Sequence, residues 1–427
     1  RLEPRLEDEP GPLIQALKAG FALLEDGRAA PTDAWRRRLV ELLDDPRPQV
    51  KLTALEVAGL WLLDDELGDA LVMRATGLAG EPWERAPALG SLARGRHPRT
   101  PELAQTFARS DQPGLRAAAA GAAAQAPSPE MADLLERLTH DPVARVRIAA
   151  LDGLLALATD PAEIAADALT DTDPAVRASL FSWLAEHPVA PVERLGEAVV
   201  QSMTDGNAES SVLGVRALAA RAQAEPLERG TLVALLENLA QYRPSWLVRR
   251  EASQALAALD RPVPPVGTVD TGKTVEIYES LLYQTARPRT VRIDTDRGAV
   301  TVRLDCPRAP LTCHNFLSLA GQGFYDGLPF HRVVPDFVVQ GGDPRGDGFG
   351  GPPYTIRDEI HPLRYERGVV GMALAGPDTG GSQFFVTLAP QPHLDGGYTA
   401  FGEVTSGMEV VERIVPGDRI RGITEIP

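Results

Sequence analysis

A repeated pattern in the first 260 residues constrains the fold of this chain more than any other feature of its sequence. Five segments share one template and span residues 44–61, 111–124, 141–157, 171–187 and 242–259. In each, an apolar residue is followed at once by a basic one: Val50-Lys51, Leu115-Arg116, Val146-Arg147, Val176-Arg177 and Val248-Arg249, with a weaker copy at Val215-Arg216. The intervals are 65, 31, 30, 39 and 33 residues, and the first is two repeats whose middle copy, near residues 83–92, has decayed. Such repeats predict stacked helical units that bury their apolar faces against one another.

Each copy of the template has the sequence of an amphipathic helix. Asp141 or Asp173 can cap the first free amides, and Pro142 or Pro174 fits the first turn, where its missing N–H costs nothing. One helix face then carries Val143, Val146, Ala150, Leu154 and Leu157. Second apolar helices, such as residues 129–140 and 230–242, lie between the copies, so the predicted unit is a helix pair.

This pattern resembles the HEAT-repeat family over about residues 10–260. The resemblance implies an all-α solenoid whose curved surface binds a protein partner. The alternative is a spacer that only presents the second half of the chain, and the sequence leaves both open.

The helical pattern stops at residues 260–267, DRPVPPVG, because proline and glycine break both helices and central strands. Residues 274–287 have the sequence of one connecting helix, and from Thr290 the apolar period changes from 3.6 residues to 2. We therefore expect a HEAT-like solenoid at 1–260, a Pro/Gly linker with a connecting helix at 261–287, and a second domain at 288–427.

Residues 267–274, GTVDTGKT, match the G-x-x-x-x-G-K-[ST] pattern of a phosphate-binding loop. That loop requires a buried strand before it, and the preceding PVPPV cannot serve as a central strand. We interpret the segment as a turn in which Thr271 or Thr274 starts the connecting helix, and a nucleotide hydrolase is the alternative.

Residues 346–351, GDGFGG, match a dinucleotide-binding pattern but precede two prolines where that site needs a helix. The histidines and cysteines show no metal-binding spacing, so we expect no metal and no other cofactor.

The second half is rich in short apolar runs separated by glycine. Residues 289–305 alternate on both sides of the turn Asp296-Arg297-Gly298, which predicts a β-hairpin. Residues 309–323 form the one clear amphipathic helix pattern in this region. Many short strands with few helices predict a closed antiparallel barrel. The expected fold class is thus a multidomain chain, all-α followed by all-β.

Three segments of this half resemble the signature segments of the cyclophilin family of peptidyl-prolyl isomerases. They are FHRVVPDFVVQGGD (330–343), GMALAGPDTGGSQFFVTL (371–388) and HLDGGYTAFGEV (393–404), and GFYDGLPFHR (323–332) extends the agreement upstream. The resemblance covers about residues 288–427. It implies a closed eight-stranded antiparallel barrel with two capping helices, and prolyl isomerase activity that assists protein folding. The alternative is a scaffold that binds proline-containing segments without catalysis.

The residues at the family's site suit this reaction. Rotation about an X-Pro bond is opposed by amide resonance, with a barrier of about 18 to 20 kcal/mol. A catalyst must favour the twisted amide, in which the prolyl nitrogen has regained its lone pair. Arg332 offers that nitrogen a permanently charged fork of donors, and Gln340 can hold the rotating carbonyl. With Phe337, they are the expected catalytic residues.

The resemblance also assigns the substrate-binding residues. An apolar slot for the proline ring is expected from Phe337, Met372, Phe385 and Leu394, with Val338 and His331 at its edge. The peptide before the proline is expected on Ala373, Leu374, Ala375 and Gln383, and the remaining members are His393 and Tyr398. His393 stands where cyclosporin-sensitive members carry Trp, so we expect weak inhibition by that drug. Taken singly, the apolar residues could be ordinary core and Arg332 a surface ion pair.

Composition limits the partners and leaves the compartment open. A formal net charge of −16 argues against nucleic acid, and no run of about 18 apolar residues suggests a membrane span. The expected partners are proline-containing protein or peptide clients, with a further protein partner on the HEAT surface.

Only three of the 43 basic residues are Lys, which is typical of a GC-rich bacterial genome. The chain opens without Met or a signal-like segment, so cytoplasm and cell envelope both remain open. Cys306 and Cys313 are expected as small buried residues, with a disulfide as the alternative.

Overall fold

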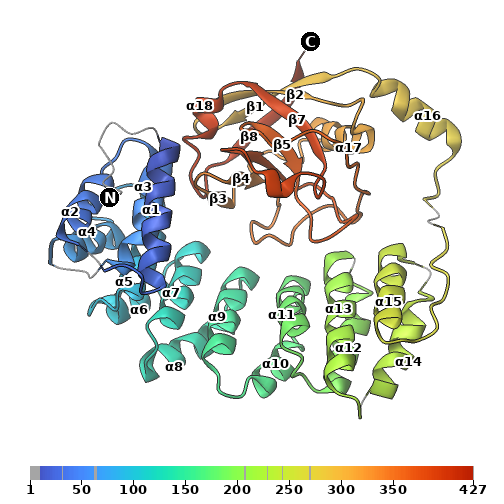
Figure 1. Ribbon diagram of the computed structural model, residues 1–427, viewed down its shortest axis with the longest axis horizontal. Helices are drawn as coiled ribbons and strands as arrows, with labels where there is room; N and C mark the ends of the chain where they lie inside the picture. The colour runs from blue at the N-terminus through green and yellow to red at the C-terminus, as the bar shows by residue number, and fades with distance from the viewer. Residues whose placement is uncertain are drawn as a thin grey trace.

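The computed structural model describes residues 10–30, 32–61, 65–205, 208–227, 229–242, 244–268 and 271–426 (Figure 1). The first nine residues of the expected solenoid lie outside this set, as do Val269 and Asp270 of the phosphate-loop match and the final Pro427. Within the described residues, no helix is both long enough and apolar enough to cross a membrane.

The N-terminal part is helical, as the repeats predict. Its elements are α1 (Pro10–Glu25), α2 (Asp33–Leu42), α3 (Pro48–Val57), η1 (Ala58–Leu60), α4 (Asp65–Thr76), η2 (Pro82–Glu84), α5 (Arg85–Arg94), α6 (Thr100–Ala108), α7 (Pro113–Gln125), α8 (Pro129–Leu138), α9 (Ala144–Leu157), α10 (Ala162–Ala168), α11 (Pro174–Glu186), α12 (Val192–Ser202), α13 (Ala208–Ala224), α14 (Arg229–Leu239) and α15 (Trp246–Ala258). Figure 1 shows them in a curved row, with α7, α9, α11, α13 and α15 on the side that faces the β-sheet. The row therefore has a concave side, and the β-sheet lies on that side.

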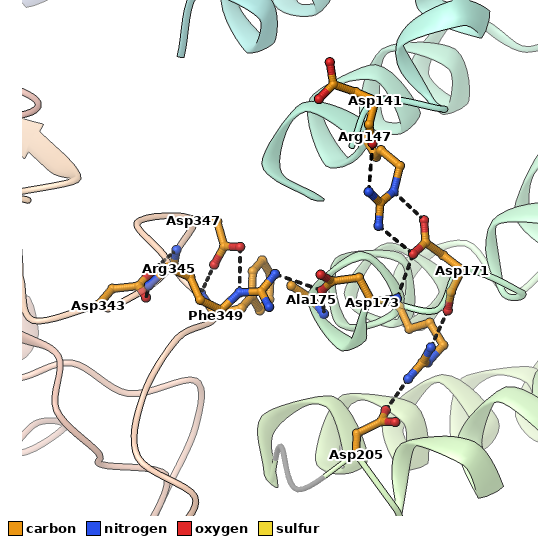
Figure 2. Close-up of polar contacts among 12 residues, drawn as sticks. Asp141, Arg147, Asp171, Asp173, Ala175, Asp205, Asp343, Arg345, Asp347 and Phe349 are labelled. Carbon is orange, nitrogen blue, oxygen red and sulfur yellow. Dashed lines mark hydrogen bonds and ion pairs between the residues drawn. The ribbon is translucent and has the colours of Figure 1, made fainter. Parts of the chain in front are cut away.

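The basic residue of the repeated dipeptide links neighbouring repeats. In α9, Val146 is fully buried, whereas Arg147 turns outward and donates to the carboxylate of Asp171 before α11, with Nε to Oδ2 at 2.7 Å. Arg147 also binds the carbonyl of Asp141, at the start of its own repeat, at 2.8 Å. The same pairing joins Arg177 to Asp205, whose carboxylate is labelled in Figure 2. It also joins Arg116 to Asp141. These pairs form a ladder of arginine and aspartate along the turns between repeats, which we call the Arg–Asp ladder.

The capping predictions were half right. Asp173 is the N-cap of α11 and accepts a hydrogen bond from the backbone N–H of Ala175 at 2.9 Å, with Pro174 in the first turn. Helix α9 instead begins at Ala144 with Val143 as its N-cap, so Asp141 caps the preceding turn by accepting from the Val143 N–H. Asp141 occupies this position because its carboxylate also accepts a hydrogen bond from Arg116.

The linker ends in one connecting helix, α16 (Val275–Gln284), whose N-cap is Thr274. Gly267 and Gly272 have positive φ values of 70° and 60°, which agrees with the expected turn. Arg249, the basic residue of the last repeat, donates to the carbonyl of Val266 at 2.8 Å. The described part of the linker is thereby bound to the end of the helical row.

The C-terminal part is one antiparallel sheet of eight strands. They are β1 (Arg289–Thr295), β2 (Gly298–Leu304), β3 (Arg332–Val334), β4 (Val338–Gly341), β5 (Val369–Met372), β6 (Phe384–Thr387), β7 (Ala400–Ser406) and β8 (Ile420–Ile426), in the order β3-β4-β6-β5-β7-β2-β1-β8. The predicted hairpin is present, because β1 pairs with β2 from Arg289↔Leu304 to Thr295↔Gly298. Helices α17 (Pro310–Gly321) and α18 (Met408–Val411) and the short η3 (Pro392–Leu394) complete this part.

The sheet is a half-barrel, and the expected closed barrel was wrong. The described strands β3 and β8 share no ladder. Residues just before β3 instead meet the start of β8 around an isolated bridge between Pro329 and Arg419, where the Ile420 N–H donates to the Leu328 carbonyl at 2.9 Å. The pairing extends no further as a ladder because β3 contains only three residues.

A buried core lies between the curved sheet and α17. The Phe316 ring meets those of Tyr325, Phe384 and Phe401 at centroid distances of 5.1 to 5.4 Å. Cys306 and Cys313 are buried free thiols, which agrees with the expectation of two small core residues. Leu52 of α3 joins this core from the helical part. The two parts therefore share apolar contacts as well as polar ones.

Candidate active site

The β3–β4 hairpin places the two main polar side chains of the site. Its register pairs Arg332 with Gln340, and residues directly opposite in an antiparallel pair point to the same face. Asp336 forms the turn with a left-handed φ of 59°, and the Phe337 N–H donates to the Val334 carbonyl at 3.0 Å. Arg332 Nη1 lies 3.4 Å from Gln340 Oε1, where it donates a hydrogen bond.

A chain of amides fixes the orientation of Gln340. Its Nε2 donates to Oε1 of Gln383 at 3.0 Å, so its oxygen is turned toward Arg332. Gln383 Nε2 in turn donates to the carbonyls of Gly348 and Gly350, at 2.7 and 3.0 Å. The structure thus brings together three of the residues predicted for the site, Arg332, Gln340 and Gln383, through direct hydrogen bonds.

Arg332 is exposed, and its charge has no carboxylate partner among the described residues. Its Cζ lies 5.5 Å from the centroid of the Phe337 ring, within the range of a cation–π contact. On another side, the Phe337 ring stacks on His393 with centroids 5.5 Å apart. The alternative reading of Arg332 as half of a surface ion pair is therefore wrong for the described chain, and its guanidinium is available to a ligand.

Most of the predicted apolar slot is one cluster. Val338, Phe385 and Leu394 are buried together, and Phe337, Ala373 and Tyr398 pack against them. The rings of Phe385 and Tyr398 meet edge to face, with centroids 6.0 Å apart. Met372 is also buried but belongs to the larger core on the other side of the sheet.

Gly371 allows Phe385 to lie this close to β5. A Cβ at Gly371 would stand 2.6 Å from Oη of Tyr365 and 2.8 Å from Cε2 of Phe385, closer than real side chains approach. Tyr365 stacks on the far face of Phe385, with centroids 5.6 Å apart. No sequence signal pointed to Tyr365, because it lies outside the three signature segments.

His331 lies beside Arg332 and is half-buried. Neither ring nitrogen has a hydrogen-bond partner in the described part of the chain. Burial lowers the pKa of His331, although Asp343 and Asp347 oppose that change. The ring is therefore neutral near pH 7 and forms an edge of the site rather than a charge within it.

The helical part contacts the rim of this site, which the sequence could not predict. Lys18 of α1 donates to the Pro335 carbonyl, and Gln15 donates to the Asp336 carboxylate. At the other end of the row, Nη1 of Arg216 lies 3.5 Å from the Ala375 carbonyl oxygen. Arg250 of α15 binds the carboxylate of Asp378 at 2.5 Å.

A cavity of about 390 Å³ lies between the helical part and the β part, next to the hydrogen-bonded amides of Gln340 and Gln383. Its β-side wall includes the predicted residues Gln340, Ala373, Leu374, Ala375 and Gln383. Its opposite wall comes from the helical part and consists of Pro174, Asp205, Ala208 and Glu209. The site is therefore a hollow with a wall from each half of the chain.

The described side chains provide hydrogen-bond donors and an apolar slot, and they contain no group of three or more His, Cys, Asp or Glu residues arranged to hold a metal ion. Such a set can bind a peptide and stabilise a polarised amide. Neither ring nitrogen of His331 has a partner among the described residues, so this ring is not arranged to activate a hydroxyl or thiol nucleophile.

Comparison with known proteins finds relatives of the C-terminal part of the chain. Residues 290–422 match the family described as cyclophilin type peptidyl-prolyl cis-trans isomerase/CLD. A peptidyl-prolyl cis-trans isomerase of Helicobacter pylori is 45% identical over 159 residues, which cover 36% of this chain and 96% of that protein. Peptidyl-prolyl cis-trans isomerase B of Bacillus subtilis is 55% identical over 130 residues, covering 30% of this chain and 91% of that protein. A cyclophilin type isomerase structure from Cryptosporidium parvum shares 35% identity with a TM-score of 0.32, covering 33% of this chain and 99% of that one.

Proposed function

The chain belongs to the cyclophilin-type peptidyl-prolyl cis-trans isomerases, and we propose how its residues carry out that reaction on X-Pro bonds. The reaction breaks no covalent bond, so catalysis must come from preferential binding of the twisted amide. Each 1.4 kcal/mol of such preference accelerates rotation about tenfold. The observation that carries the proposal is the exposed guanidinium of Arg332, which has no carboxylate partner among the described residues.

In the proposed mechanism the proline ring enters the slot formed by Phe337, Phe385 and Leu394. Arg332 then donates to the prolyl nitrogen, which becomes a hydrogen-bond acceptor only when the amide twists. Phe337 positions the guanidinium, because Arg332 already lies over its ring. Gln340 binds the carbonyl of the residue before proline, and Gln383 keeps its amide oriented for that contact.

The peptide before the proline is proposed to run along Ala373, Leu374 and Ala375. Met372 supports this stretch from the core, while His331, Val338, His393 and Tyr398 form the edges of the slot. A scaffold without catalysis is the less favoured function, because Arg332 and Gln340 are held ready and the matched relatives are named as isomerases.

We further propose that residues 1–260 form a HEAT-like solenoid that binds part of a protein client, with a linker at 261–287 and the isomerase domain at 288–427. The Arg–Asp ladder and the curved row of helices in Figure 1 support this division. Folding assistance follows if the solenoid holds a client while the isomerase acts on its prolines.

The Arg332→Ala variant of the full chain tests the proposed reaction. Removing one donor of this kind costs roughly 10²-fold in turnover, so kcat/KM on a proline-containing peptide should fall by about that factor. Arg292→Ala is the matched control, because Arg292 is exposed on β1 and pairs with Asp294 away from the site. Equal rates for the wild type and Arg332→Ala would reject the catalytic role of Arg332.

A further inference from the structure

The cavity between the two halves has one acidic side chain that the structure leaves without a partner. Glu209, in the first turn of α13, lines the cavity and has no hydrogen bond or ion pair with any described residue. The other acidic residue of that wall, Asp205, is neutralised by Arg177 in the Arg–Asp ladder. Glu209 is therefore the free carboxyl group of the helical wall.

The one basic residue of the lining is already paired. Arg345 donates to Asp173 at 2.8 Å and to Asp347 at 2.9 Å, as Figure 2 shows. Asp343 is fully buried beneath this loop and accepts the backbone N–H groups of Arg345 and Gly348, at 2.7 and 2.6 Å. No cation of the described lining is thus left for Glu209.

The surroundings of Glu209 favour a cation from outside. Burial and the charges of Asp343 and Asp347 raise the pKa of Glu209 to about 7. Its carboxyl is therefore close to half ionised at neutral pH. A positively charged ligand would favour the ionised form and bind to it more strongly as the pH rises.

The position of the cavity says which part of a client would meet Glu209. The opposite wall contains Ala373, Leu374, Ala375 and Gln383, the proposed contacts of the residues that precede the proline. A side chain from that stretch would enter the cavity, whose 390 Å³ can hold a long one. Its far end would reach the helical wall.

We propose that Glu209 makes the isomerase selective for clients with a lysine or arginine shortly before the target proline. The inference rests on the proposed function, because it names a substrate class for the same site. In the proposed arrangement, Glu209 of the helical part determines the specificity of a reaction that the β part catalyses.

The test uses the full chain and two peptide series. In each series the peptides are identical except for Lys, Gln or Glu, placed two residues before the proline in one series and three in the other. The measured quantity is the ratio of kcat/KM for Lys to that for Gln. At pH 8 the wild type should give a ratio of about 5 to 10 in at least one of the two series. Glu209→Gln should give a ratio of about 1 in both series. Glu197→Gln, an exposed residue of α12, should keep the wild-type ratio.

A second readout needs no variant. Because Glu209 becomes neutral below its pKa of about 7, the wild-type Lys-to-Gln ratio should fall toward 1 between pH 8 and pH 6. A ratio that is unchanged by Glu209→Gln, or that does not vary with pH, would overturn the inference while leaving the isomerase intact. Wild-type protein that isomerises none of the peptides would overturn the proposed function and this inference together.

Discussion

Arg345, in the loop after β4, donates a hydrogen bond to the N-cap residue of α11, Asp173, at 2.8 Å across 172 residues of sequence. Phe349 of the same loop packs against the helical core. A loop that lines the proposed substrate cavity is therefore held by the middle of the helical row. The helical row therefore positions this loop of the site, in addition to lying around the β part.

The first prediction concerns this docking. Arg250→Ala combined with Arg345→Ala removes two ion pairs between the parts, and each partly buried pair should cost about 1 to 2 kcal/mol. The isomerase domain should then separate from the row for part of the time, which small-angle X-ray scattering would detect as a larger radius of gyration. The control is Arg292→Ala with Arg303→Ala, whose pairs stay within the sheet. Identical scattering from both double variants would contradict the prediction.

The second prediction concerns Gly371. In Gly371→Ala the new methyl group must displace Tyr365 or Phe385, and overpacking of this kind costs about 1 to 3 kcal/mol. The melting temperature should fall, and kcat/KM should fall with it because Phe385 forms the proposed slot. Gly321→Ala, at the end of α17 where a Cβ meets no neighbour, should change neither quantity appreciably. A Gly371→Ala protein that melts like the control would show that the slot can adjust.

The third prediction concerns the Arg–Asp ladder. Asp171→Ala leaves the partly buried Arg147 without its carboxylate and also removes the cap on the Asp173 N–H, so about 2 to 3 kcal/mol of stability should be lost. Denaturant unfolding followed by helical circular dichroism measures the loss. Glu102→Ala breaks a fully exposed pair with Arg99, and because solvent screens that pair it should lower the stability much less. Equal losses for the two variants would mean that the ladder adds no more than a surface pair.

The fourth prediction concerns His393, which is exposed and stacks on Phe337. If its replacement of a tryptophan weakens cyclosporin binding, His393→Trp should restore an indole N–H and a larger flat surface. Inhibition of isomerisation should then require at least about tenfold less drug, since 1.4 kcal/mol corresponds to a factor of ten. His140→Trp, on an exposed turn of the helical part, serves as the control. Strong inhibition of the wild type would refute the premise.

The sequence predicted local features well and long-range ones poorly. The alternation around residues 296–298 predicted the β1–β2 hairpin, and the spacing of Val146, Ala150 and their neighbours predicted helices, because both signals are local periods. Leu157 was an exception, since it is 40% exposed. The partners of Arg147 or Arg177 could not be read from the sequence, because they depend on how one repeat stacks on the next.

The same limit applies to the site. Arg332 and Gln340 could be predicted because they lie eight residues apart on one hairpin. Lys18 and Glu209 could not, because their neighbourhood arises only when the row curves around the sheet. Closure of the barrel was predicted wrongly because it depends on backbone pairing between β3 and β8, which in the structure is limited to a few hydrogen bonds beside the Pro329–Arg419 bridge.

The shared core has a consequence for the order of events during synthesis. Leu52 is buried in the core of the β part, and its neighbour Gln49 donates to the carbonyl of Ile414, which lies 365 residues later. At about 5 to 20 residues per second, a ribosome needs about 20 to 70 seconds to cover that distance. The first helices must therefore wait in an incomplete state while the chain is made. The contacts between the first helices and the β part can form only after the last strands have been made, even if the helices themselves form early.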